Sequence, residues 1–216
     1  MKSGNFHLKE ISIDLVLKKY FPLLFLIMMT SQAVQAQTDF RLSMEKFQQS
    51  RNDINRTAMI VLGSWAAGNI LTGVYGNFKA KGEAKYFNQF NAMWNVVNLG
   101  IATFGYLSAS NSDPSLMGNA SIFSEYSSMQ SFLLLNAGLD VAYIATGLYL
   151  KEKSKNSSSG ERLRGYGNSL LLQGGFLLIF DTALYFIHQS NASVNLYPHI
   201  ESLTAGGVGL IMNINF

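Results

Sequence analysis

Four apolar stretches, each about as long as a membrane-spanning helix, dominate this sequence of 216 residues. A helix needs about twenty predominantly apolar residues to cross the hydrocarbon of a bilayer. None of the four stretches contains lysine or arginine, and a soluble bundle would have to bury all four. The sequence therefore predicts an all-α fold, a four-helix transmembrane bundle. Its expected spans are residues 57–76, 90–108, 131–150 and 169–188.

The N-terminal region has the features of a secretory signal peptide. Lys18 and Lys19 precede the apolar run YFPLLFLIMM, and small residues follow up to Ala36. This pattern predicts cleavage after Ala36, because the apolar run is too short to span a bilayer comfortably. An uncleaved anchor helix is the alternative. The expected parts are a signal peptide (1–36), an extracytoplasmic N-terminal segment (37–56), the transmembrane domain (57–188) and an extracytoplasmic tail (189–216).

The loops between the spans differ in charge. Loops 77–89 and 151–168 contain three and five basic residues, whereas loop 109–130 contains no lysine or arginine. Basic loops tend to stay in the cytoplasm. We therefore expect the first and third loops inside and both mature termini outside, which agrees with the signal peptide. The predicted location is a bacterial inner membrane.

The last residues suggest a different kind of structure. Leu210, Met212, Ile214 and Phe216 alternate with other residues, as in a half-buried strand. A terminal Phe after such alternation also resembles the last strand of an outer-membrane barrel. A barrel needs many alternating segments, however, and residues 57–188 show continuous apolar runs instead. We expect a short extended C-terminal tail, with the outer membrane as the alternative location.

Polar residues recur within the spans at helical spacing. Asn91, Asn95 and Asn98 step by four and three, so they lie on one face of their helix. The other spans carry similar stripes. A polar group that faces lipid without a partner costs several kcal/mol. The stripes should therefore face each other and form a polar bundle core.

Two carboxylates in these stripes define a candidate ligand or ion site. Asp140 lies about 14 Å from the outer end of its span and Asp181 about 10 Å from its own, at 1.5 Å per residue. Carboxylates at this depth are expensive, and they favour binding of a proton, a cation or a small polar ligand. The structural alternative is that polar groups only fix helix packing. The candidate site comprises Asp140, Asp181, Asn95, Asn98, Asn69, Asn136, Tyr143 and Gln173.

Several classes of function have no support in the sequence. No HExxH, GxSxG or phosphate-binding glycine loop is present, so we predict no catalytic residues. The chain has no cysteine, and neither a metal site nor a cofactor is expected. A basic stripe with interleaved aromatic residues is also missing, so we expect no nucleic-acid partner. The expected partners are the lipid bilayer and either further copies of the chain or another membrane protein.

Three segments carry a resemblance to a known group of proteins. The segments MIVLGSWAAGNI, YFNQFNAMWNVVN and LLQGGFLLIFDTALYF resemble those of a family of small uncharacterised bacterial membrane proteins with a domain of unknown function. The resemblance covers about residues 52–190. It implies a four-helix membrane architecture, and it implies neither an activity nor site residues. Two functions stay open: a protein that binds or conducts a ligand, proton or cation, and a non-catalytic structural or accessory subunit.

Overall fold

The protein is helical throughout the part that the computed structural model describes, residues 13–205. Four long helices are joined by short turns and single 3-10 turns, and a short fifth helix follows. The all-α prediction is confirmed. The elements are α1 (Ile13–Lys79), α2 (Gly82–Asn111), η1 (Pro114–Leu116), α3 (Asn119–Lys153), η2 (Ser154–Asn156), α4 (Gly160–Asn195) and α5 (Tyr197–Ala205).

The chain divides into two units, residues 1–42 and 43–216. In the first unit, α1 exposes an apolar run that includes Tyr20 and Leu24. The helix continues without a break through Ala36 and through the expected start of the first span at residue 57. Residues 1–12 lie outside the described part, so the cleavable signal peptide stays a prediction.

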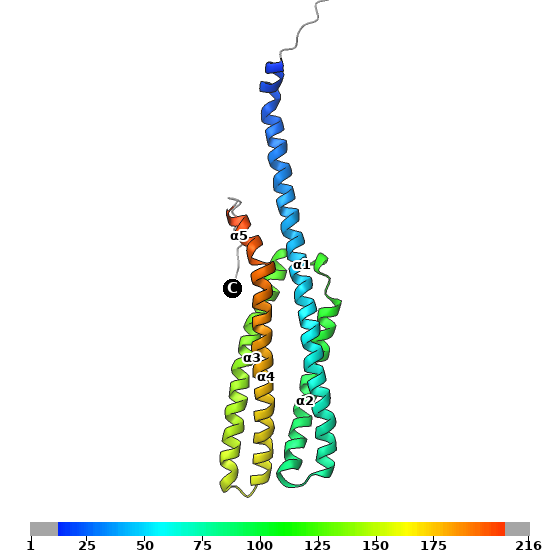
Figure 1. Ribbon diagram of the computed structural model, residues 1–216, viewed down its shortest axis with the longest axis vertical. Coiled ribbons are helices and arrows are strands. Elements are labelled where there is room, and N and C mark those ends of the chain that lie inside the picture. The colour runs from blue at the N-terminus through cyan, green and yellow to red at the C-terminus, as the bar shows by residue number, and fades with distance from the viewer. Residues whose placement is uncertain (1–12, 206–216) are drawn as a thin grey trace, which may run out of the picture. The chain divides into compact units, whose positions relative to one another are not determined.

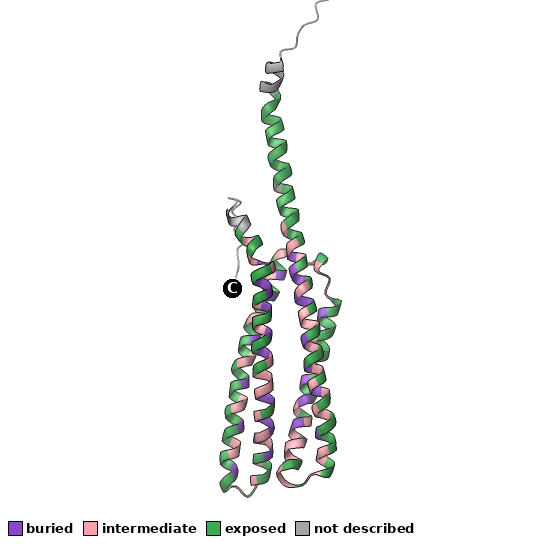
Figure 2. Cartoon of the chain, in the orientation of Figure 1, coloured by how far each residue is buried: buried purple, intermediate pink, exposed green. Residues whose placement is uncertain are grey.

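The second unit consists of two antiparallel helical hairpins. One is formed by residues 43–79 of α1 with α2, and the other by α3 with α4 (Figure 1). The turns of the two hairpins lie at the same end of this unit, and they are the two basic loops of the sequence (Figure 1). Buried residues follow one face of each helix, whereas the opposite faces are exposed (Figure 2).

Three of the helices are long and apolar enough to cross a membrane by length and composition, within the described residues. They are α1, α3 and α4. The sequence predicts a fourth span in α2, but α2 does not meet the same hydropathy level. The asparagines of α2 lower its mean hydropathy, and three of them are buried rather than exposed. The outward faces are strongly apolar, with Leu71, Phe104 and Ile179 among the most exposed side chains.

Close helix packing depends on glycine at the contact between α3 and α4. A Cβ atom built on Gly147 would lie 2.8 Å from the carbonyl oxygen of Gly167, which is closer than real Cβ contacts. A Cβ atom built on Gly167 would likewise lie 2.7 Å from the carbonyl oxygen of Gly147. Small residues at such crossings let two helix backbones approach each other, as they do in known membrane proteins.

The C-terminal region departs from the sequence prediction. We expect an extended tail from residue 189, but α4 runs to Asn195 and α5 follows at Tyr197–Ala205. The prediction of an extended segment is therefore wrong for residues 189–205. The side chain of Leu196, between the two helices, is fully buried, so packing holds the chain at this bend. The alternating residues 210–216 lie outside the described part.

Candidate functional site

A network of amide side chains joins α1, α2 and α4. Nε1 of Trp65 donates to Oε1 of Gln173 at 3.1 Å, and Nε2 of Gln173 donates in turn to Oδ1 of Asn91. Nδ2 of Asn91 donates to Oδ1 of Asn69 at 2.8 Å. The amide of Asn69 donates to the backbone oxygen of Trp65 at 2.8 Å, which closes the network on α1.

The network extends along α2. Nδ2 of Asn95 donates to the backbone oxygen of Asn91 at 2.8 Å, and Nδ2 of Asn98 donates to Oδ1 of Asn95 at 3.4 Å. All three asparagines are buried. The stripe predicted on this helix thus faces the interior and is hydrogen-bonded there. These two bonds lie within α2, whereas the bonds of Asn91 to Asn69 and Gln173 connect α2 to α1 and α4.

The two acids of the spans come together from α3 and α4. Asp140 is 2% exposed and Asp181 is 7% exposed. Both residues line the same cavity. Oδ2 of Asp140 has no hydrogen-bond partner within residues 13–205. A buried polar atom normally has a partner, so this oxygen points to a proton or a ligand that completes the site.

The acid pair lines a cavity of about 770 Å³. This volume lies within the range of pockets that bind small molecules. Residues from α1, α2, α3 and α4 form the wall, which is mostly aliphatic and aromatic. The ring of Trp94 on α2 packs edge-on against Tyr143 on α3, with centroids 4.8 Å apart, and both side chains line the cavity.

The structure separates the predicted site residues into two groups. Asp140, Asp181, Asn98, Asn136 and Tyr143 line the cavity. The remaining three do not line it and belong to the amide network instead. These are Asn69, Asn95 and Gln173.

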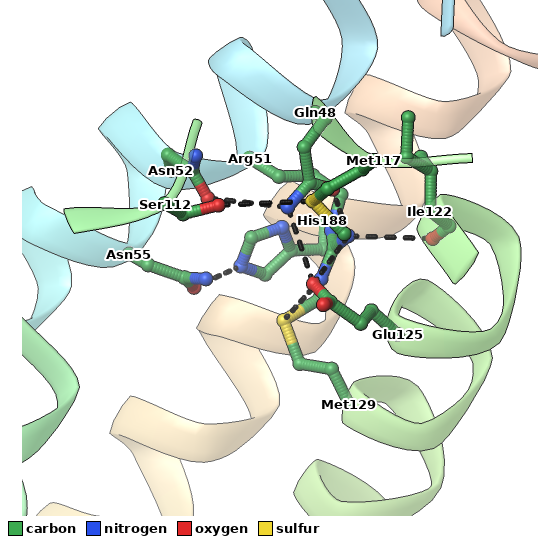
Figure 3. Close-up of polar contacts among 10 residues, drawn as sticks. All are labelled: Gln48, Arg51, Asn52, Asn55, Ser112, Met117, Ile122, Glu125, Met129 and His188. Atoms are coloured by element: carbon green, nitrogen blue, oxygen red, sulfur yellow. Dashed lines mark hydrogen bonds and ion pairs between the residues drawn. The ribbon is translucent and has the colours of Figure 1, made fainter. Parts of the chain in front are cut away.

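A second polar cluster lies at the other end of the cavity, where α1, α3 and α4 meet (Figure 3). Arg51 is 3% exposed and donates to Oε1 of Gln48 and to the backbone oxygen of Ile122. Its Nη1 lies 3.9 Å from Oε2 of Glu125. Nε2 of His188 lies 2.9 Å from Oδ1 of Asn55. The His188 side chain is fully buried.

This second cluster was missed because it begins before the expected first span. Gln48, Asn52 and Asn55 repeat every three or four residues and lead into Met59 of the span. The same helical periodicity that identifies the stripe of α2 would have extended the α1 stripe into residues 37–56. The apolar run begins only at residue 57, so these polar positions lie before the span that hydropathy predicts.

The fold and its interior define a helical protein with candidate membrane spans, buried polar residues and a hollow core. The profile of a family of unknown function (DUF6992) matches residues 61–182, more than half of the chain. The chain therefore belongs to this family. The matched region includes the acid pair and the amide network, but not Arg51. Neither the curated proteins nor the solved structures contain a match to the chain.

Proposed function

We propose that this chain is an integral membrane protein that binds a proton or a small cation at the Asp140–Asp181 pair. The pair is buried, it opens on a cavity, and no lysine or arginine occurs in the four expected spans. Two adjacent carboxylates in a medium of low dielectric repel each other strongly. A shared proton or a bound cation removes this repulsion and gives the unpartnered Oδ2 of Asp140 a partner.

The proposed setting is a bacterial inner membrane crossed by all four helices, with the basic loops inside. Charge distribution supports this orientation, and the apolar outer faces support contact with lipid. The asparagines of α2 fit this arrangement, because the Asn91 amide bonds to neighbouring helices rather than facing lipid. Conduction through so small a bundle would require several copies of the chain to assemble, whereas binding alone would not.

A structural or accessory role is the second candidate. The observation in its favour is the amide network, in which Asn69, Asn91, Asn95 and Gln173 all have hydrogen-bond partners. Such a network fixes helix register without any ligand. If the second candidate is right, Asp140 and Asp181 also stabilise helix packing. D140N and D181N would then change only the stability of the protein.

Thermal unfolding in lipid nanodiscs tests the proposal. The parent protein is measured across pH and with sodium, potassium or calcium chloride against choline chloride. A ligand that binds only the folded state raises the unfolding temperature. We expect a dependence on pH or on one of these cations that is lost in both D140N and D181N.

The matched control is D113N, which removes an exposed acid outside the spans. The hydroxyl and backbone N–H of Ser115 donate to Asp113 and hold the pKa of its carboxyl below the usual aspartate range. A depressed pKa stabilises the fold above the unfolded-state pKa, and this contribution is lost only in acid. D113N should therefore keep the parent's dependence near neutral pH. A parent that responds to neither pH nor cation, or acid-pair variants that respond as the parent does, would contradict the proposal.

A further inference from the structure

Two buried hydrogen-bond donors at the Arg51 end of the cavity have no partner within the part of the chain that the structure describes. Arg51 and Asn52 are 3% and 4% exposed, and both line the cavity. Within the described residues, Nε of Arg51 and Nδ2 of Asn52 have no hydrogen-bond partner (Figure 3). Leaving a buried donor unpaired is energetically unfavourable. These two donors therefore favour a ligand that brings acceptor atoms.

The charge of Arg51 is only partly matched by the chain. Glu125 is the acid beside it, but the two groups are 3.9 Å apart and the Glu125 side chain is 54% exposed. The other groups around the guanidinium are neutral. They include Gln48, the backbone oxygen of Ile122, the sulfur of Met129, the rings of Phe47 and Tyr126, and the imidazole of His188.

The wall that leads away from these donors is apolar. Asp181 precedes Asn191 by ten residues, which is about 15 Å along α4. Asn191 accepts a hydrogen bond from Ser50, the neighbour of Arg51, so this length approximates the separation of the two polar ends. The lining side chains between them include Met59, Leu62, Ile101, Phe132 and Leu184.

We propose that the cavity binds a single-chain amphiphile whose anionic head group lies at Arg51 and Asn52. Guanidinium pairs well with carboxylate and phosphate oxygens, so either head group fits the donors. The hydrocarbon chain lies along the apolar wall toward the acid pair. A free inorganic anion would satisfy the donors and leave the wall uncovered. This inference concerns the other end of the cavity and does not depend on what the acid pair binds.

Fluorescence quenching tests this site with defined probes. Trp94 lines the cavity, whereas Trp65 stacks on Phe176 with centroids 3.9 Å apart and does not line it. The full chain in nanodiscs of zwitterionic lipid is titrated with a brominated medium-chain carboxylic acid, its methyl ester and the matching brominated alkyl phosphate. Bromine quenches a nearby indole. We expect saturable quenching by the acid or the phosphate, no saturable quenching by the ester, and loss of the saturable signal in W94F.

Two variants assign the head-group site. R51M should weaken binding about tenfold or more, since a charge-assisted hydrogen bond contributes about 1.5–3 kcal/mol. E125Q should bind more tightly, because it removes the carboxylate that competes for Arg51. Its amide oxygen can still accept the hydrogen bond that Nε2 of Gln48 donates to Glu125. If R51M does not fold, E125Q and the ester decide the result.

Each outcome supports or overturns the proposal. If the brominated carboxylic acid binds more tightly than the alkyl phosphate, the ligand is of the fatty-acid type. If the alkyl phosphate binds more tightly, the ligand is of the lysolipid type. Equal quenching by acid and ester, or unchanged affinity in E125Q, would overturn the proposal. Displacement of the brominated probe by inorganic phosphate as efficiently as by alkyl phosphate would also overturn it, because the hydrocarbon chain would then contribute nothing.

Discussion

The indole of Trp65 on α1 donates a hydrogen bond to the side-chain oxygen of Gln173 on α4, at 3.1 Å. Gln173 is fully buried, and its Nε2 donates a second hydrogen bond to Oδ1 of Asn91 on α2. One side chain thus connects three helices. Pairing of this kind inside the bundle explains why amides such as Gln173, Asn91 and Asn69 occur within the apolar spans.

Replacing Gln173 with methionine should destabilise the protein by about 1–2 kcal/mol, because it leaves the Trp65 N–H and the Asn91 oxygen without this partner. The measurement is the free energy of unfolding in mixed micelles. Q49M is the matched control, since Gln49 is exposed and bonds only to Asp53 of its own helix. Equal stability of Q173M and Q49M would show that the network does not hold the helices together.

The glycine contact between α3 and α4 gives a second prediction. G147A should destabilise the bundle by about 1–3 kcal/mol, because the added methyl group would meet the Gly167 carbonyl at 2.8 Å and force the helices apart. G138A, on the same helix, meets nothing within 4 Å. It should be neutral or stabilising, because alanine favours a helix more than glycine does. Thermal unfolding of both variants makes the comparison, and equal losses would contradict the packing account.

The orientation can be tested with single cysteines, because the chain contains none. Leu116 is exposed in the non-basic loop, and Ser158 is exposed in a basic loop. In intact cells with a permeabilised outer membrane, a membrane-impermeant maleimide should label L116C. It should label S158C only after the inner membrane is opened. The reverse pattern would contradict the predicted topology.

The helical fold and the inward polar stripes could be predicted from the sequence because helical spacing is a local signal. The asparagines of α2 lie at intervals of three and four, and burial of that face follows from the cost of exposing amides to lipid. The positions of Asp140 and Asp181 on inward faces follow in the same way. Hydropathy alone was less informative for α2, since its own amides lower the mean value.

What could not be predicted depends on contacts between helices. Nothing local shows that Gln173 bonds to Asn91 while Asp181, two turns later, opens on a cavity. Helix rotation and side-chain volume decide this difference. The Arg51 cluster was missed for another reason, because the expected span began at residue 57 while α1 continues the same polar stripe before it. The helical residues 189–205 show that weak hydropathy does not imply an extended chain.

Infrared spectroscopy of the carboxyl groups tests the central claim most directly. The protein in bilayers is titrated with acid and then with the cation that shifts its unfolding temperature, and D140N and D181N assign the bands. We expect a carboxyl band that responds to pH or cation in the parent and is lost in either variant. Because the two acids form one site, removing one should also change the band of the other. Carboxyl bands that ignore both pH and cation, or that respond independently of each other, would contradict a shared site at Asp140 and Asp181.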